Sequence, residues 1–173
     1  MSIEIVCKQA LTLDEEKNLF EWSNDPFGMA EVGLEWIQWL PEKWHMVAYK
    51  EQIAISHVGI LKQTLLIGQQ SLSLGGIAGV VTIPSSRGKG YAHQLLECSL
   101  NFMRDKLQVD FGLLFCLPRL VPFYEGLGWT QINNDFVFMQ ASGRVNTPLP
   151  VMTIQCKTLK WPSGKIELGS YPW

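Results

Sequence analysis

Hydrophobic and polar residues alternate near the start of the chain and then follow a helical period. Ile3 to Lys8 alternates and predicts a first strand. A helix is expected next, because Thr12 can cap its first turn and Glu15 stands three positions later, which is the pattern of a capping box. This helix is expected to run to about Ser23. A second helical stretch is expected to run through Trp39, after a break rich in turn-forming residues.

The middle of the chain has short apolar runs separated by turn residues, which predict strands. Glycines interrupt the last of these runs, and a glycine inside a strand is typical of a bulge or of the close approach of another group. The glycines are Gly75, Gly76 and Gly79. The predicted strands are His45–Tyr49, Ile53–Leu61, Thr64–Ile67 and Ser71–Ile83.

The second half alternates between helical and strand patterns. A long helix is expected from Ala92 to Leu107, because its apolar residues recur at helical spacing. A buried strand, a short helix closed by Gly128 and two more strands are expected after it: Phe111–Cys116, Leu120–Leu127, Phe136–Gln140 and Val151–Lys157. The order predicts a mixed α/β fold in one domain, with a twisted, mixed and largely antiparallel sheet flanked by helices.

Length and composition narrow the class of protein. The chain has 173 residues, 47% of them apolar and 17% charged, as expected for one globular domain. A formal net charge of −2 argues against a nucleic-acid partner. The apolar runs are strand-sized and the first residues lack the pattern of a secretion signal, so neither a membrane span nor export is expected. We therefore expect a cytoplasmic protein.

The residues that bind metals or form disulfides are scattered. The four cysteines form no Cys-x-x-Cys pair and are expected to be buried, reduced thiols. Metal ligation is not expected, because the three histidines show no clustered spacing.

A basic, glycine-containing loop stands between an apolar strand and the long helix. Arg87-Gly88-Lys89-Gly90 leads into Tyr91 and Ala92 at the predicted helix start. A helix start presents unpaired N–H groups and a positive dipole end, and glycines let the backbone approach an anion closely. The loop therefore indicates a site for a phosphorylated ligand. It does not match a P-loop, since Ile83 stands where the first glycine belongs. As a dinucleotide fingerprint it is weak, since His93 stands in place of the third glycine.

Two segments together resemble the GNAT superfamily of N-acetyltransferases. Arg87 to Ala92 spells Arg-x-x-Gly-x-Ala after a strand, which is similar to that family's coenzyme A pyrophosphate loop. Phe123 to Trp129 resembles the family's Phe-Tyr-x-x-x-Gly-Phe/Trp segment. The resemblance implies a GNAT fold with residues 1–70 mainly on the acceptor side, 71–129 binding acetyl-CoA and 130–173 forming the C-terminal strands and tail. It also implies acetyl-CoA as co-substrate, and a homodimer is compatible with it.

The resemblance assigns roles to the second half of the chain. Val81, Thr82 and Ile83 would give main-chain groups to the pantetheine arm, and Arg87, Gly88, Lys89, Gly90, Tyr91 and Ala92 would hold the pyrophosphate. Tyr124 matches the tyrosine that protonates the departing sulfur, and a phenol with an ordinary pKa of about 10 remains protonated at neutral pH. Packing of the helix against the sheet is the alternative role for Tyr124.

Within the superfamily, the glycine-rich strand and the Trp-ended tail resemble the aminoglycoside 2′-N-acetyltransferase branch. In that branch an acidic residue precedes the pantetheine contacts, and Gly79 occupies the matching position. Trp173 is the last residue, so its terminal carboxylate is a candidate for binding the substrate ammonium; the alternative is a loose hydrophobic tail. Asp25 is a candidate substrate ligand or part of a turn. His57 is a candidate base or a core histidine.

Seven tryptophans are many for this length. Trp36 and Trp39 would share one helical face and are expected to pack in the core, and an aromatic acceptor cleft is the alternative. The chain is thus predicted to be an N-acetyltransferase that moves an acetyl group from acetyl-CoA to a primary amine by direct attack. The expected acceptor is a small amine such as an aminoglycoside. The alternatives are acetylation of a protein or peptide and a catalytically weak acyl-CoA-binding or sensing module.

Overall fold

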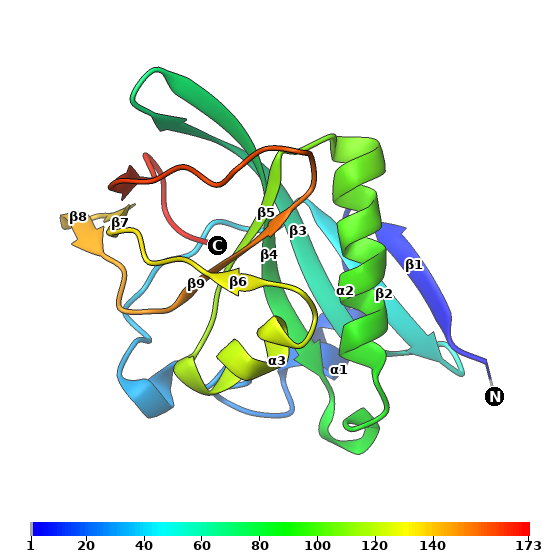
Figure 1. Cartoon of the computed structure of the whole chain (residues 1–173). Coiled ribbons are helices and arrows are strands. Elements are labelled where there is room, and N and C mark those ends of the chain that lie inside the picture. Colours follow the sequence, from blue (N-terminus) through cyan, green and yellow to red (C-terminus); the bar gives the residue numbers. More distant parts are fainter. Residues whose placement is uncertain (1) are drawn as a thin grey trace.

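The computed structural model describes residues 2–173. A long sheet forms the centre of the molecule. Its seven strands lie in the order β1-β2-β3-β4-β5-β9-β6 (Figure 1). Only β4 and β5 run parallel, and the other neighbours are antiparallel. The strands are β1 (Glu4–Lys8), β2 (Trp44–Lys50), β3 (Ile53–Ile67), β4 (Gln70–Thr82), β5 (Phe111–Phe115), β6 (Thr130–Gln131) and β9 (Val151–Gln155). The mixed α/β fold with a largely antiparallel sheet is confirmed.

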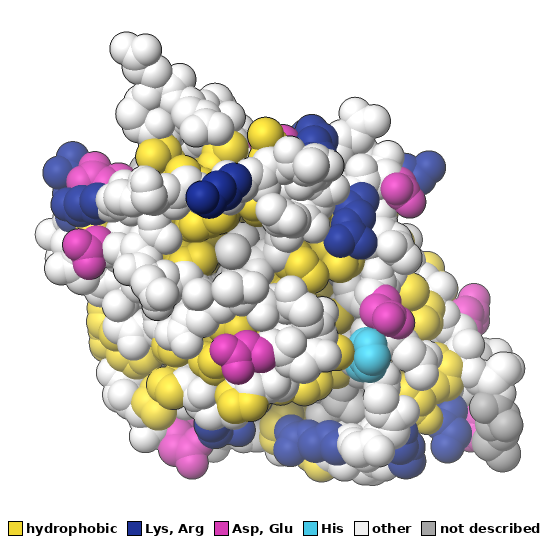
Figure 2. All heavy atoms as spheres, in the orientation of Figure 1, with side chains coloured by type: hydrophobic (Ala, Val, Ile, Leu, Met, Phe, Trp, Pro, Cys, Tyr) yellow, Lys and Arg dark blue, Asp and Glu magenta, His cyan; other side chains and the backbone are white. Residues whose placement is uncertain are grey.

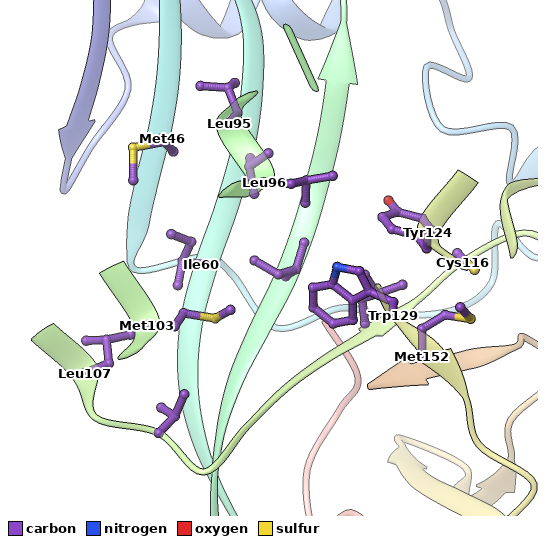
Figure 3. Packing of buried hydrophobic residues seen from close by; sticks show 14 of the residues in the cluster. Met46, Ile60, Leu95, Leu96, Met103, Leu107, Cys116, Tyr124, Trp129 and Met152 are labelled. Carbon is purple, nitrogen blue, oxygen red and sulfur yellow. The ribbon is translucent and has the colours of Figure 1, made fainter. Parts of the chain in front are cut away.

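Helices cover both faces of this sheet. On one face lies α2 (Tyr91–Phe102), which continues into a π-helical turn, η3 (Met103–Leu107), and buries Leu95 and Leu96 against β2 to β4 (Figures 1 and 3). On the other face α1 (Leu13–Phe20) buries Leu19. The capping box at Thr12 and Glu15 is present as predicted. The opposite faces follow from strand alternation, since neighbouring β2 residues point to opposite sides.

A small second sheet closes the other end of the molecule. It consists of β10 (Ile166–Glu167), β7 (Phe136–Gln140) and β8 (Gly143–Asn146), in that order. Phe136 and Phe138 pack with the far ends of β3 and β4. The sequence predicted β7 but not β8 or β10, because two- and four-residue strands carry too little alternation to stand out.

Several expectations were wrong in detail. Residues 21–43 hold no long helix, only the 3₁₀ turn η1 (Ala30–Val32). Trp36 is consequently 49% exposed and does not pack in the core. The predicted strands at 53–61 and 64–67 form one continuous β3. The cysteines are all free, but Cys7 is exposed, contrary to the expectation of buried thiols.

The remaining elements are short and connect the sheet to the site. Pro84–Ser86 forms the 3₁₀ turn η2, and η4 (Pro118–Leu120) leads into α3 (Val121–Glu125). None of the helices within residues 2–173 is long and apolar enough to cross a bilayer. Charged side chains of both signs are dispersed over the face that carries α2 (Figure 2).

Candidate active site

A cavity lies where β4 and β5 separate. The two strands pair only from Leu74–Ile77 on β4 with Phe111–Leu114 on β5, after which β4 continues to Thr82 without β5 and remains paired with β3. The cavity has a volume of about 390 Å³ and lies between this open edge, α3 and the loop that precedes β2. Its walls include Gly79, Val80, Cys116, Tyr124 and Trp173. A separation of two parallel strands leaves main-chain groups of β4 free to bind a ligand as an added strand would.

The direction of these main-chain groups differs from the prediction. The Ile83 N–H donates to the Ile55 carbonyl on β3 at 3.0 Å, so it is not available to a ligand. Val81, two residues earlier, pairs with His57 and faces β3 in the same way. Alternation therefore turns Val80 and Thr82 toward the open edge.

A bulge marks the start of this open segment. Gly79 and Val80 together lie opposite the single residue Val58, because Ala78 pairs with Gly59 and Val81 with His57. Gly79 has a φ of +54°, a conformation that favours glycine. The bulge expected from the glycines is therefore present.

The predicted pyrophosphate loop has the conformation of an anion site. Gly88 and Gly90 have φ values of +73° and +78°, and Gly90 is the N-cap of the twelve-residue helix α2. No side chain caps this helix, and its first turn contains no acidic residue. A Cβ at either glycine would meet nothing within 4 Å, so the space above the loop is open. The first N–H groups of α2 are thus directed into accessible space.

Arg87 stabilises the junction between β4 and the loop. Its Nε donates to the Thr82 carbonyl at 3.0 Å, and its guanidinium lies 4.8 Å from the ring centre of Trp22. These contacts hold the charge of Arg87 beside the open edge of β4. Lys89 reaches back to the Ser85 carbonyl at 3.3 Å. Both basic residues are exposed and remain near the uncapped helix start.

Tyr124 lies in the cavity wall on α3. The residue is 4% exposed, and its ring packs edge-on against Trp129 with ring centres 6.3 Å apart. Burial, with a smaller contribution from Cys116, raises the pKa of Tyr124 above its ordinary value. The hydroxyl points away from α3, on the side where β4 runs in Figure 3. A protonated hydroxyl therefore faces the cavity, and the same ring also packs the helix, so both roles expected for Tyr124 are compatible.

Cys116 also lines the cavity, which the motifs did not indicate. Burial raises the pKa of its thiol to about 11. A thiol with that pKa is a poor nucleophile at neutral pH, since the thiolate is the reactive form.

His57 lies beneath the bulge and is 1% exposed. Its Nδ1 donates to the Gly79 carbonyl at 2.6 Å, so its Nε2 accepts from Nδ1 of His45 at 2.9 Å. Burial lowers the pKa of His57 to about 4. Both ring nitrogens are engaged, which leaves none for a substrate proton, so the structure supports a core histidine that holds the Gly79 carbonyl in place.

Trp173 is anchored in the fold, which excludes the loose tail. Its side chain is 3% exposed and its indole N–H donates to the Leu113 carbonyl at 3.0 Å. The Pro172 carbonyl accepts from the Leu40 N–H at 2.7 Å, which ties the tail to the loop before β2. The tail therefore helps to build the cavity wall. Binding of an ammonium by the terminal carboxylate stays a prediction.

Asp25 has the turn role. One carboxylate oxygen accepts from the Met29 N–H at 2.8 Å and the other from the Glu31 N–H at 3.2 Å. These bonds shape the loop that carries Phe27 and Met29 into the cavity wall. Asp25 thus acts on the acceptor side through its neighbours, and a direct contact with a substrate stays a prediction.

The sequence did not single out Glu42, whose side chain reaches the cavity from the loop before β2. It lies across Gly59 and Gly79, and its Oε1 is 2.6 Å from the position that a Cβ at residue 79 would occupy. The glycine at 79 did indicate the close approach of another group, but nothing in the sequence identified which residue approaches. Among residues 2–173, no three His, Cys, Asp or Glu side chains are grouped to hold a metal ion.

Comparison with known proteins agrees with this geometry. Residues 9–132 match the family described as acetyltransferase (GNAT) domain. A GNAT family N-acetyltransferase (YhbS) from Escherichia coli, solved in complex with CoA, has a TM-score of 0.61 and 15% identity, covering 98% of this chain and 92% of that one. An acyl-CoA N-acyltransferase from Pseudomonas aeruginosa has a TM-score of 0.57 and 20% identity, covering 88% and 99% of the two chains. No curated protein matches in sequence.

The chain belongs to the GNAT acetyltransferase family, because the family match covers well over half of its residues. The predicted family and fold are confirmed, and acyl-CoA-dependent N-acyl transfer is the chemistry of this class of protein. These two structural neighbours, at 15% and 20% identity, support the fold alone. The resemblance to the aminoglycoside 2′-N-acetyltransferase branch stays a prediction.

Proposed function

We propose that this protein is an N-acetyltransferase that moves an acetyl group from acetyl-CoA to a primary amine by direct transfer. The observation that carries the proposal is the continuity of three features: the uncapped start of α2, the open edge of β4 and the cavity that contains Tyr124. Together they offer an anion site, a strand edge and a proton donor in the order in which a coenzyme A thioester presents its pyrophosphate, pantetheine arm and acyl group.

The residues present fit such a ligand. The open space above Gly88 and Gly90 leaves room for a phosphate at the first N–H groups of α2, and Arg87 and Lys89 add positive charge. Val80 and Thr82 turn main-chain groups to the open edge, although the Thr82 carbonyl already accepts from Arg87. The Val80 N–H is therefore the group we assign to the ligand beside the cavity, where a fixed dipole stabilises developing negative charge.

Acetyl-CoA bound there would supply an activated thioester carbonyl. Tyr124 holds the proton for the departing sulfur, and its raised pKa keeps that proton in place at neutral pH. Burial raises the pKa of Cys116 to about 11, so this residue remains a thiol at neutral pH. A thiol is a poor nucleophile, which favours direct transfer over an acyl-enzyme intermediate. The walls around Tyr124 are mostly apolar, and the lower effective dielectric constant beside them strengthens each of these polar interactions.

The charge and the size of the cavity on the acceptor side distinguish the candidate substrates. The aminoglycoside expected from the branch resemblance carries several ammonium groups, and it would need several carboxylates. A peptide would need a longer groove than one cavity of about 390 Å³. The third alternative, a binding or sensing module, draws support from Gly79 in place of the acid of that branch. A small amine is the acceptor that a cavity of this volume favours.

Binding of acetyl-CoA tests the proposal directly. We expect calorimetric titration to give a dissociation constant in the micromolar range, and Arg87→Ala to weaken it by about tenfold, because one charge-assisted contact and the Thr82 anchor are lost. Lys106→Ala removes one charge at the opposite end of the same helical segment and is the matched control. Equal affinity of wild type and Arg87→Ala would show that the loop has been assigned wrongly.

A further inference from the structure

We propose that Glu42 is the base that takes a proton from the acceptor, and that the acceptor is a monoamine with an apolar or aromatic body. This inference rests on the proposed function and adds the residue and the substrate class that the sequence left open. The space above Gly79, which a side chain at that position would fill, is the structural observation behind it.

The carboxylate of Glu42 fills this space. Its Oε1 lies 2.6 Å from the position of a Cβ at residue 79, so any side chain there would displace it. Gly59, the neighbour across the sheet, leaves room for the Glu42 methylenes in the same way. Two glycines on adjacent strands therefore form a slot for one glutamate. The carboxylate at this position thus comes from the loop before β2 and not from β4.

The loop that carries Glu42 is fixed on both sides. The Lys43 N–H donates to the Ile60 carbonyl on β3 at 2.9 Å, and the Leu40 N–H donates to the Pro172 carbonyl at 2.7 Å. Below the slot, His57 holds the Gly79 carbonyl through its Nδ1. A carboxylate held between a pinned loop and a pinned bulge keeps its position without a substrate, which is what a general base needs.

Among the described residues that line the cavity, Glu42 is the only Asp or Glu. The other ionisable side chains in that wall are Cys116, with a pKa of about 11, and Tyr124, with a raised pKa. Lys, Arg and His are absent from the lining residues, so the described wall offers no cation to neutralise the carboxylate. A single carboxylate side chain matches one ammonium group.

The rest of the acceptor side is apolar. Its walls include Phe27, Met29, Trp39, Leu40 and Pro41, all near Glu42 in the chain or brought to it by the Asp25 turn. An ammonium group among such walls loses solvation, which favours its neutral form and makes proton loss to a nearby carboxylate easier. A polycation would bury charges without partners here, which is costly. An arylalkylamine fits both the walls and the single carboxylate.

The ammonium gives one proton to Glu42, and the neutral nitrogen forms a bond to the acetyl carbon while the carbon–sulfur bond breaks. The sulfur takes the hydroxyl proton of Tyr124, and the second proton of the nitrogen returns to Tyr124 through solvent. Glu42 releases its proton to solvent, so each turnover releases one proton.

Steady-state kinetics with 2-phenylethylamine and kanamycin test the proposal. We expect wild type to acetylate 2-phenylethylamine with a kcat/KM at least about tenfold above that for kanamycin. Glu42→Gln should lower kcat about a hundredfold at pH 7. That loss should shrink as the pH approaches about 10, where solvent deprotonates the amine without help. Glu42→Asp should recover part of the rate, and the exposed Glu35→Gln is the control for a nearby charge.

A binding measurement separates the role of Glu42 from the proposed acetyl transfer. Titration of 2-phenylethylamine into the CoA-bound protein, followed by the change in tryptophan fluorescence, should show several-fold weaker binding to Glu42→Gln, with CoA affinity unchanged. Two of the seven tryptophans, Trp39 and Trp173, line the cavity. Wild-type rates in Glu42→Gln at pH 7, or a loss that does not change with pH, would overturn the role of Glu42 while acetyl transfer stands. Preference for kanamycin would overturn the substrate class. Absence of acetyl-CoA binding in wild type would overturn the proposed function and this inference together.

Discussion

The indole of Trp173 occupies the space that a side chain at Gly76 would need. A Cβ at residue 76 would overlap the indole nitrogen, and that nitrogen donates to the Leu113 carbonyl on the neighbouring strand at 3.0 Å. We expect Gly76→Ala to destabilise the fold by about 2 kcal/mol, because the buried indole has to shift and its hydrogen bond is strained. Chemical denaturation measures this loss. Gly169→Ala, where a Cβ would meet nothing within 4 Å, should leave the stability unchanged, and an equal loss in both variants would contradict the packing argument.

The terminal carboxylate of Trp173 can be tested without removing its indole. Adding one glycine after Trp173 moves the carboxylate and leaves the buried side chain in place. If the carboxylate binds the acceptor ammonium, the KM for the amine should rise several-fold while the melting temperature stays the same. Truncation is a poor test, since removing a buried tryptophan costs about 3–5 kcal/mol by itself. An unchanged KM in the extended protein would leave the tail a purely structural role.

The glycines of β4 show how far the sequence could predict this site. It indicated a bulge or a close approach at Gly75, Gly76 and Gly79, and the structure has both. It could not name the approaching groups, because Trp173 and Glu42 come from distant segments without a periodic pattern. The fold and the loop at Arg87 to Ala92 were predictable because strand alternation, helical spacing and glycine dihedrals are local properties.

The acceptor side was predicted less well for a physical reason. Residues 21–43 have enough apolar side chains to suggest a helix, but they form mostly irregular loop held by long-range bonds such as that from Leu40 to Pro172. Tertiary contacts override local propensity in such a segment. The direction of the Ile83 N–H depends likewise on pairing with β3, and motif matching alone assigned it to the wrong side.

Replacing Tyr124 by phenylalanine should separate proton donation from packing. The ring that packs against Trp129 is kept, so the stability and the affinity for acetyl-CoA should stay close to wild type. Loss of the proton donor should lower kcat by about a hundredfold. Steady-state kinetics and calorimetric titration give the two quantities. Leu127→Ala, which shortens a partly buried side chain packed against the same core, is the control for a general loosening of this region. A Tyr124→Phe protein that retains the wild-type kcat would exclude Tyr124 as the acid.

The buried His57 should make the stability depend on pH in a defined window. Burial lowers the pKa of His57 to about 4, while in the unfolded chain it has an ordinary value of about 6.5. Between these values the unfolded state binds more protons than the folded state, so the free energy of unfolding falls as the pH drops from about 6.5 to about 4. The loss from this residue is up to about 3 kcal/mol.

The neighbours of His57 affect the same measurement. Burial also lowers the pKa of His45 and adds a loss in the same direction, which Glu42 and Glu16 oppose. The Glu15 carboxylate, despite burial, has a pKa of about 2 because Lys8, Tyr49 and the Thr12 N–H bond to it, so its contribution is lost only between about pH 4.5 and pH 2. Urea denaturation from pH 7 to pH 5, above the range in which Glu15 titrates, should therefore show a decline that His57→Asn reduces and Glu15→Gln does not. A decline of the same size in His57→Asn would show that His57 is not neutral in the folded protein, or that its protonation does not cost stability.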